Sequence, residues 1–368
     1  LMSINIYPDE RYYRENEDRG GPDVEIMMHA AMPDLDEHPI LMKDEDGRFW
    51  ASAWAMCLLP FWDLNEGYMM KFGRDVELFW HGELIPPDTE IPIEEGWNYL
   101  TYLPTYQLPC TAPDFYAFDS IIEELEIVKD PNGYFYVPQF EFSNMPPLQA
   151  GNAYQIKMSE EVVFTYPPEP EEEALAFIGH AQQYLFYYDR VEVTGSNMSL
   201  LLRGEVLQPG SEIGVYSNSG ILVGSSTITT NGVCGLAVWG DDPTTEELEG
   251  SSDNESLEVK MWNSVDNTEI YLIVQSGNPV YQTDDFTVSN VSQKPETPQE
   301  FFLSEPFPNP FNNVVKLTYQ LPEAASVSIE VFDTSGRLVS TLVNGNIPAG
   351  YHVVSWDGRG VSSGVYLL

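Results

Sequence analysis

Short runs of alternating apolar and polar residues recur along the chain, and most of these runs end in Gly, Pro, Asn or Asp. Alternation with a period of two is typical of half-buried β-strands, and the bounding residues favour tight turns. A length of 368 residues exceeds one ordinary core and indicates two to four domains. The pattern therefore predicts a mainly all-β, multi-domain protein in which small β modules and Ig-like β-sandwiches follow one another as beads.

The first half of the chain contains an internal repeat. Residues 41–80 and 127–166 align without a gap at an offset of 86, and residues 3–8 resemble residues 99–104 at an offset of 96. The identical positions include Lys43/Lys129, Asp44/Asp130, Gly47/Gly133 and Tyr68/Tyr154. Repetition over this length predicts two copies of one small β-rich domain, the first with ten extra residues in an acidic, tyrosine-rich loop.

Each copy carries an Asp- and Gly-containing turn, "DEDG" at residues 44–47 in the first copy. Such a sequence favours a β-hairpin, because Gly adopts positive φ without a steric clash. The same sequence matches the first positions of a calcium-binding loop, but the later carboxylate ligands of such loops do not follow. The second copy has Pro131 and Asn132 at the positions of Glu45 and Asp46. The hairpin is the preferred interpretation.

Proline- and acid-rich segments close the two copies, at residues 83–96 and 166–174. Proline stiffens such linkers and neighbouring glutamates repel one another, so we expect the modules to be held apart. From Phe177 to about Asn290, short apolar runs with turn residues at regular spacing predict a β-sandwich. The predicted domains are copy 1 at 1–93, copy 2 at 94–173, a β-sandwich at 174–298 and an Ig-like domain at 299–368.

The charge is strongly negative and unevenly distributed. The chain has 58 acidic and 16 basic residues, a net charge of -42, whereas residues 301–368 hold five acidic and three basic residues. The net charge of that segment is -2, so -40 lies upstream, which favours a domain boundary near residue 300. An acidic surface repels phosphate backbones and anionic lipids, which argues against nucleic-acid and membrane-surface partners. No apolar run has the length of a membrane span, so membrane insertion is not expected.

An acidic loop at residues 240–258 contains eight carboxylates. A run of this kind is usually a solvated loop, which is the preferred interpretation. The alternative is a calcium site, with Asp241, Asp242 and Asp253 as the candidate ligands.

The three cysteines, Cys57, Cys110 and Cys234, form no CxxC pair and therefore indicate neither a zinc site nor a disulfide framework. We expect three buried free thiols, and a Cys57–Cys110 bridge is the alternative.

Residue patterns that carry catalysis are missing. The five histidines are scattered, and no HExxH, GxSxG, P-loop or GxGxxG sequence occurs. We therefore expect no enzyme, no catalytic residue and no cofactor apart from the calcium alternative. Trp54, Trp62 and Trp97 would favour carbohydrate binding if they are exposed, and ordinary cores if they are buried.

The C-terminal segment resembles a known family. Its sequence begins "PFPNPFNNVVKLTYQLP" and ends "SWDGRGVSSGVYLL". This pattern is similar to the C-terminal sorting domain of type IX secretion substrates, which resembles the Ig-like domain of the flagellar hook-capping protein. The matching positions are Pro308, Asn309, Pro310, Phe311, Asn312, Gly336, Arg337, Gly350, Trp356, Asp357, Gly358, Gly364 and Tyr366. The tandem modules, with Gly96-Trp97-Asn98 in the second, also resemble repeats that accompany such domains in large surface proteins.

The resemblance implies a secreted protein, extracellular or on the outer cell surface, whose export partner is the type IX machinery. Adhesion, or self-association into a fibre or surface layer, is the expected role. The alternative is a carbohydrate-binding or spacer region of a larger secreted hydrolase. The chain starts within a strand pattern and ends before the last strand and basic tail of that family, so we expect it to be truncated at both ends.

Overall fold

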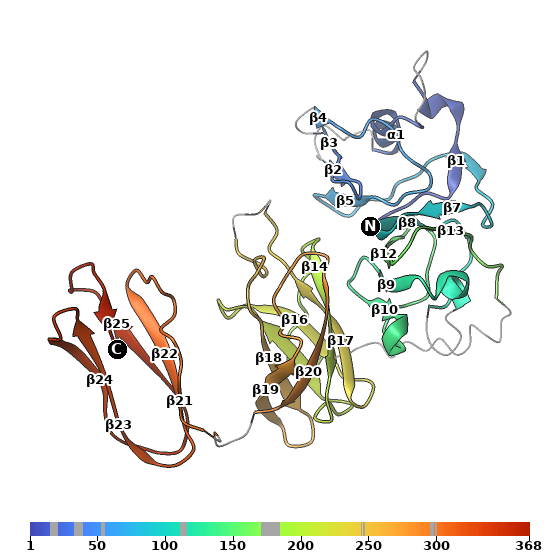
Figure 1. Ribbon diagram of the computed structural model, residues 1–368. Coiled ribbons are helices and arrows are strands. Elements are labelled where there is room, and N and C mark those ends of the chain that lie inside the picture. The colour runs from blue at the N-terminus through green and yellow to red at the C-terminus, as the bar shows by residue number, and fades with distance from the viewer. Residues whose placement is uncertain are drawn as a thin grey trace. The chain divides into compact units, whose positions relative to one another are not determined.

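The chain forms two compact units, Leu1–Ser292 and Gln293–Leu368, in a computed structural model (Figure 1). Strands dominate both units, which confirms the predicted all-β, multi-domain fold. None of the helices among the described residues is long and apolar enough to cross a membrane. The structure describes all residues except 15–20, 33–39, 53–55, 111–115, 171–184, 244, 246, 295–297 and 299.

The first repeat is a four-stranded antiparallel sheet in the order β4-β3-β2-β5, and one helix packs on it. Helix α1 (Val24–Ala31) begins at Asp23, whose carboxylate accepts a hydrogen bond of 2.8 Å from the backbone N of Ile26. Met27 and Met28 of the helix are fully buried in the core of this repeat. The other elements of the repeat are β1 (Ile6–Pro8), η1 (Glu10–Tyr12), β2 (Ile40–Lys43), β3 (Phe49–Ala51), β4 (Met56–Cys57), β5 (Met69–Phe72) and β6 (Gly82–Leu84).

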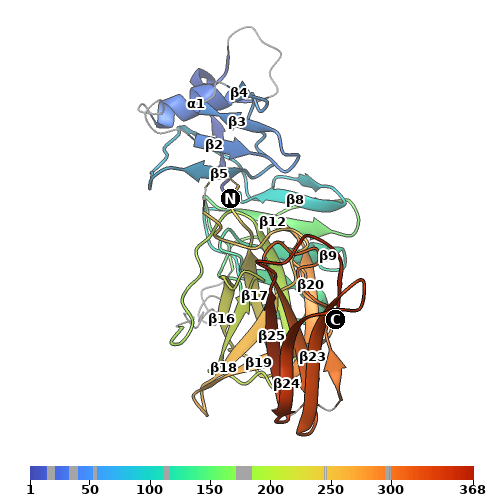
Figure 2. The same cartoon turned by 90° about the vertical axis from the view of Figure 1, so that its left-hand side faces the viewer.

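The second repeat has the same strand order, β11-β10-β9-β12, with β8 added beside β12 (Figure 2). The register is also the same, since Leu41 lies opposite Lys71 in the first repeat and Ile127 lies opposite Lys157 in the second. The offset of 86 residues therefore holds for strand pairing as well as for sequence. The elements of the second repeat are β7 (Ile91–Ile93), β8 (Gly96–Thr101), η3 (Tyr116–Ile121), β9 (Leu125–Lys129), β10 (Phe135–Val137), η4 (Pro138–Phe140), β11 (Phe142–Ser143), β12 (Ala153–Met158) and β13 (Val162–Phe164).

The proline-rich segment between the repeats is not a spacer. Strand β7 lies within it and pairs antiparallel with β13, with Pro92 opposite Val163. Ile91 and Ile93 alternate with Pro92 and are buried in the core of the second repeat. Proline is compatible with an edge strand, where one side of the backbone needs no partner. The expectation that this segment holds the modules apart is therefore wrong.

The third module is a seven-stranded sheet in the order β16-β15-β18-β19-β20-β14-β17. Apolar residues from both halves of this order, among them Leu200 and Leu236 on one half and Val215 and Met261 on the other, form one buried core. The sheet is thus folded into a sandwich. Its strands are β14 (Asn197–Arg203), β15 (Glu212–Tyr216), β16 (Leu222–Thr227), β17 (Val233–Trp239), β18 (Glu258–Asn263), β19 (Thr268–Ser276) and β20 (Phe286–Gln293).

This third module packs directly on the second repeat. Phe135 of β10 and Leu201 of β14 belong to one buried cluster. The ammonium group of Lys129, which is completely buried, donates a hydrogen bond of 3.2 Å to the carbonyl of Asn197. Burial of apolar residues at the junction explains why the first 292 residues form one compact unit rather than separate beads.

The C-terminal unit contains two three-stranded sheets, β21-β22-β25 and β24-β23-β26. Ile329 and Val331 of β23 are buried whereas Ser326 and Ser328 are exposed, as the alternation predicts. Trp356 is also buried in this core. The strands are β21 (Phe302–Leu303), β22 (Val314–Leu321), β23 (Ala325–Asp333), β24 (Leu338–Ile347), β25 (Gly350–Asp357) and β26 (Tyr366–Leu367).

All three cysteines are free thiols. Cys110 and Cys234 are buried as expected, but Cys57 is exposed, so the prediction of three buried thiols is wrong at that position. Cys57 ends the two-residue strand β4, which is the edge strand of the first sheet among the described strands.

Candidate functional site: the aromatic cleft of the C-terminal unit

An open cleft of about 420 Å³ lies in the C-terminal unit and is lined by residues of both its sheets. Val315 of β22 and Val331 of β23 are buried residues that contribute to its lining. Six residues of the C-terminal sequence motif line this aromatic cleft: Asn309, Pro310, Phe311, Trp356, Gly364 and Tyr366. The fold therefore brings together residues that are up to 57 positions apart in the sequence.

Three aromatic rings form the wall of the cleft. The ring centroids of Phe311 and Trp356 lie 5.4 Å apart, and those of Trp356 and Tyr366 lie 5.0 Å apart in an edge-on arrangement. The hydroxyl of Tyr366 donates a hydrogen bond of 2.5 Å to the carbonyl of Ser362. Because the rings hold one another at favourable angles, the cleft has a defined apolar surface.

Backbone features of the motif shape the entrance. The backbone N and O of Phe307 pair with those of Lys316 at 2.9 Å, and Pro308 and Pro310 follow this pair without an N–H to extend it. A Cβ atom on Gly358 would lie only 2.9 Å from the ring of Phe311, so the absence of a side chain at this position leaves room for the ring. The motif prolines and this glycine therefore have structural roles at the cleft.

Two carboxylates lie in the turns near these strands, Asp357 exposed and Asp333 partly buried. Hydrogen bonds from Arg359 lower the pKa of Asp357 to about 2. Hydrogen bonds from Ser335 and Arg337 lower the pKa of Asp333 to about 2 in the hairpin between β23 and β24. Both carboxylates are thus ionised at neutral pH and paired with an arginine, which fixes the turns.

The other motif residues do not line the cleft. Gly336, with φ near +79°, and Arg337 belong to the hairpin turn between β23 and β24. Gly350 begins β25 opposite Leu321. Asn312 is exposed beside Phe311. These positions shape the sandwich rather than the cleft.

The three aspartates predicted as calcium ligands are engaged in separate interactions. Asp241 accepts a hydrogen bond from the backbone N of Glu249 at 2.9 Å, and Asp253 accepts one from the backbone N of Thr283 at 3.1 Å. Asp242 forms an ion pair of 2.5 Å with the first repeat, through Lys71. Within the described part of the chain, no group of three or more His, Cys, Asp or Glu side chains is arranged to hold a metal ion. Calcium binding stays a prediction, since residue 246 of this loop lies outside the described residues.

Of the three tryptophans named as sugar platforms, the two that the structure describes are not exposed. Trp62 is completely buried in the core of the first repeat. Trp97 is half-buried, and the ammonium group of Lys129 lies 5.3 Å from its ring centroid. Trp54 lies outside the described residues. Trp62 therefore has the role of an ordinary core residue, and Trp97 takes part in the junction with the third module.

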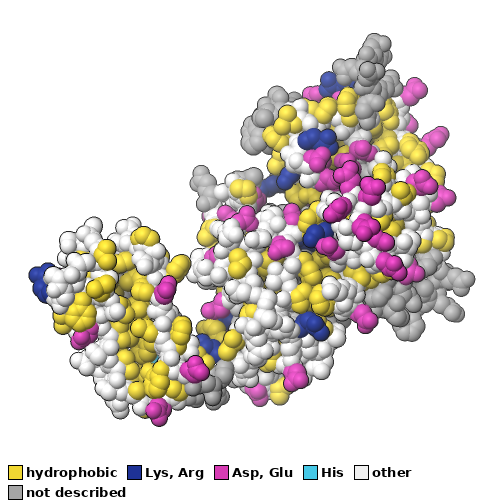
Figure 3. Space-filling view, in the orientation of Figure 1, with side chains coloured by type: hydrophobic (Ala, Val, Ile, Leu, Met, Phe, Trp, Pro, Cys, Tyr) yellow, Lys and Arg dark blue, Asp and Glu magenta, His cyan; other side chains and the backbone are white. Residues whose placement is uncertain are grey.

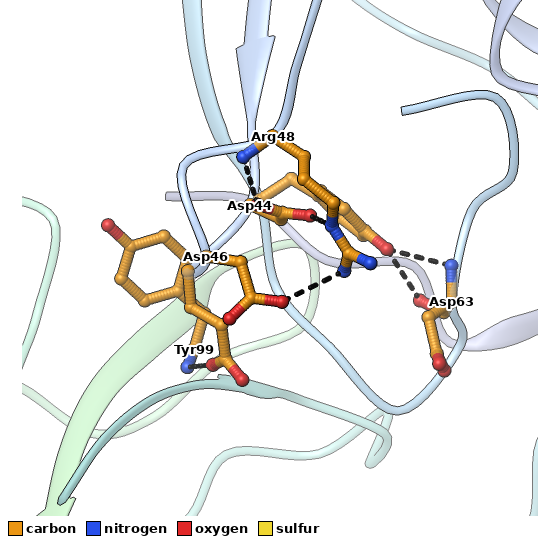
Figure 4. Close-up of polar contacts among 7 residues, drawn as sticks. Asp44, Asp46, Arg48, Asp63 and Tyr99 are labelled. Atoms are coloured by element: carbon orange, nitrogen blue, oxygen red, sulfur yellow. Dashed lines mark hydrogen bonds and ion pairs between the residues drawn. The ribbon is translucent and has the colours of Figure 1, made fainter. Parts of the chain in front are cut away.

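The "DEDG" turn is the predicted hairpin and also part of an acidic cluster (Figure 4). Gly47 has φ near +80°, and the buried carboxylate of Asp44 binds the side chain of Arg48 at 2.5 Å. Next to it, one carboxylate oxygen of Glu45 accepts a hydrogen bond of 2.5 Å from the backbone N of Tyr99 in the second repeat. The turn thus joins the two repeats.

Sequence reasoning missed two titratable groups in the first unit, Glu66 and Lys129. Burial raises the pKa of Glu66 to about 7, and the nearby carboxylates of Glu45 and Asp63 act in the same direction. Burial lowers the pKa of Lys129 to about 8, against the opposing effect of Asp284. Lys129 could have been noticed as a charge inside the apolar run "EIVKD", but the residue that covers it lies far away in the sequence.

Comparison with known proteins finds one similarity. Residues 311–367 match the family model of the FlgD Ig-like domain. Neither the comparison with curated proteins nor the comparison with solved structures gives a match for the chain. The Ig-like resemblance predicted for the C-terminal segment is thereby confirmed, and it spans all three aromatic rings of the cleft.

Proposed function

We propose that this protein is a secreted or surface-displayed structural protein whose C-terminal unit is recognised by the type IX export machinery. The observation that carries the proposal is the aromatic cleft, because it gathers residues of the sorting-domain motif in one accessible place. A cleft with rigid rings and flanking prolines is a suitable recognition feature for a folded substrate. The proposed destination is the outer cell surface or the extracellular medium.

The surface of the C-terminal unit supports a role in recognition. Of the 23 large hydrophobic side chains that are exposed among the described residues, eleven belong to residues 301–368. Apolar groups gathered on a small domain commonly mark an interaction surface. Asp and Glu side chains, in contrast, gather on the first unit (Figure 3). The C-terminal unit carries few charges, so a partner that binds it would have few charged groups to desolvate.

Adhesion or assembly into an extracellular layer or fibre is the proposed role of the whole chain. The β modules of the first unit pack on one another, and among the described strands of the C-terminal unit the ten-residue strand β24 lies at a sheet edge. An open edge can receive a strand from another molecule through main-chain hydrogen bonds. A head-to-tail contact of this kind does not close and extends into a fibre.

Export tests the proposal in the native host. We expect deletion of residues 303–368, or the substitution Phe311→Leu, to leave most of the protein in the periplasm. Phe311→Leu keeps an apolar side chain but removes the ring that contacts Trp356. The measurement is the amount of full-length protein in periplasm and medium, with thermal unfolding of each purified chain to check folding.

Val353→Ala is the matched control, because Val353 is 67% exposed on the same unit and does not line the cleft. It should be secreted like the unmodified chain. Normal secretion of the deletion variant would contradict the proposal and would leave the Ig-like unit as a spacer.

Self-association is expected to strengthen as NaCl or calcium concentration rises. The charge of -42 opposes association, and its repulsion is screened over about 8–10 Å in physiological salt. Light scattering of the purified chain across a salt and calcium series measures the effect. Leu338→Lys on β24 should weaken association, whereas Leu84→Lys, an exposed position in the first unit, should not. A monomer under every condition would remove the fibre from the proposal.

A further inference from the structure

The outer face of the third module carries an unusual set of side chains. Along β18, Val259 and Met261 are buried in the core, so the residues between and after them, Lys260 and Trp262, lie on the opposite face. The register places Tyr271 of β19 opposite Lys260. Lys260, Trp262 and Tyr271 therefore share the outer face of this sheet.

A short segment before the sandwich is fixed onto this face by one carboxylate. Glu212 of β15 is completely buried and accepts hydrogen bonds from three consecutive backbone N–H groups, those of Phe186 at 2.6 Å, Tyr187 at 3.1 Å and Tyr188 at 3.0 Å. Charge-assisted bonds of this kind are the strong ones. The absence of a side chain at Gly214 leaves room for the ring of Tyr188, which would lie 2.8 Å from a Cβ atom there.

The clamped segment places a ring in parallel with the sheet's tryptophan. The rings of Tyr187 and Trp262 are stacked with centroids 5.6 Å apart and an interplanar angle of 9°. Tyr187 remains 49% exposed and Tyr271 remains 46% exposed. We name Tyr187, Tyr216, Trp262 and Tyr271 the aromatic platform. The sheet and the bonds to Glu212 fix the position of this platform, and the rings of Tyr187 and Tyr271 remain accessible to solvent.

One cation lies within the platform and is balanced by carboxylates. The ammonium group of Lys260 lies 4.6 Å from the ring centroid of Tyr216 and 4.9 Å from that of Tyr271. It also lies 3.8 Å from Glu258 and 3.6 Å from Glu269. The cation–π contacts and the two carboxylates satisfy this charge. The platform is therefore not an anion-binding site.

We propose that the aromatic platform binds a neutral polysaccharide. The C–H groups on the face of a sugar ring are apolar and slightly positive, so they pack on the negative face of an aromatic ring. The sugar hydroxyls at the ring edge can bond to Lys260, Glu258 and Glu269 around the rings. A strongly negative molecule repels acidic polysaccharides, which leaves neutral glycans as the class that fits both the rings and the charge.

A neutral polysaccharide would be the ligand of the adhesive role proposed above. The proposal rests on that role only for where the protein meets the polysaccharide, and binding itself does not require export. The test uses purified protein and needs no secretion. A failure here therefore leaves the export proposal intact, and a failure of export leaves this site intact.

The experiment measures retention of the full chain by insoluble or gel-embedded cellulose, xylan, mannan and starch, with polygalacturonate as an anionic probe. We expect retention by at least one neutral glycan, and a loss of affinity of about tenfold or more in Tyr187→Ala and Tyr271→Ala. Phe79→Ala is the control, because Phe79 is 71% exposed but belongs to the first repeat. It should bind like the unmodified chain.

Trp262 provides a second readout. Its intrinsic fluorescence should shift when the retained glycan's soluble oligosaccharide is added, and the shift should be lost in Tyr187→Ala if folding, followed by circular dichroism, is unchanged. Binding to none of the neutral glycans, binding only to polygalacturonate, or equal retention of platform and control variants would each overturn the proposal.

Discussion

Replacing Lys129 with alanine is expected to lower the free energy of unfolding of the first unit by about 2–3 kcal/mol, whereas Lys43→Ala should change it by less than about 0.5 kcal/mol. The two lysines occupy the same position of the repeat. Lys43 is exposed, but Lys129 is completely buried and lies 3.7 Å from a carboxylate oxygen of Asp284. Removing it leaves the carbonyl of Asn197 without this donor and empties a buried volume.

Denaturant unfolding of the full chain, followed by tryptophan fluorescence, measures both variants. The transition of the first unit should move in Lys129→Ala, and any separate transition of the C-terminal unit should stay in place. Equal losses of unfolding free energy in Lys129→Ala and Lys43→Ala would contradict the prediction, because they would show that the contacts of Lys129 with the third module do not stabilise the first unit.

The first unit is expected to lose stability as pH rises from about 4.5 to 7 because of Glu66. Its pKa is raised from 4.5 to about 7 in the folded state, so the folded chain binds more protons than the unfolded chain between these values. The contribution of Glu66 is therefore fully present below about pH 4.5 and is lost as pH rises to 7. Solvent screening at this half-buried group reduces the expected loss to about 1–2 kcal/mol. Glu45, whose pKa burial also raises, acts in the same direction.

Glu66→Gln should remove this part of the pH dependence and make the chain more stable than the unmodified protein at pH 8. Glu90→Gln removes one charge at an exposed position and serves as the control for overall repulsion. The measurement is the difference in unfolding free energy between pH 5 and pH 8 for the three chains. If the two variants flatten the pH dependence equally, net charge is responsible and Glu66 is not.

The repeat shows how much of the fold could be predicted from the residues. Identical turn residues at an offset of 86, such as Gly47 and Gly133, predict the same hairpin, and both glycines have positive φ. The turns account for the pairing of β2 with β3 and of β9 with β10, but not for β5 beside β2 or β12 beside β9, because those strands are not consecutive in the chain. The alternation of apolar and polar residues in β23 likewise agrees with its buried face.

Contacts between modules could not be predicted in this way. Alternation tells which face of a strand is apolar, but not which distant element covers it. Lys129 and Trp97 meet the third module through residues about 70 to 190 positions away, and no local pattern encodes that distance. The prolines around Ile91 were interpreted as linker residues, although the apolar alternation of "IPI" was the correct signal. Helix α1 is too short for its periodicity to stand out from the acidic loop before it.

The hairpin turn of each repeat touches the module that follows it in the chain. In the first repeat, Glu45 binds the backbone of Tyr99, and in the second, Gly133 lies so close to Ala237 that a Cβ would come within 2.4 Å of the Ala237 Cβ. The same turn, through different residues of it, thus faces the following module in both repeats. A further copy inserted between the two repeats would use this turn for its contact with the next module, but it would separate Lys71 of the first repeat from Asp242 of the third module. The number of copies would then set the size of the first unit, so gene duplication could enlarge this unit with a turn contact that is already present.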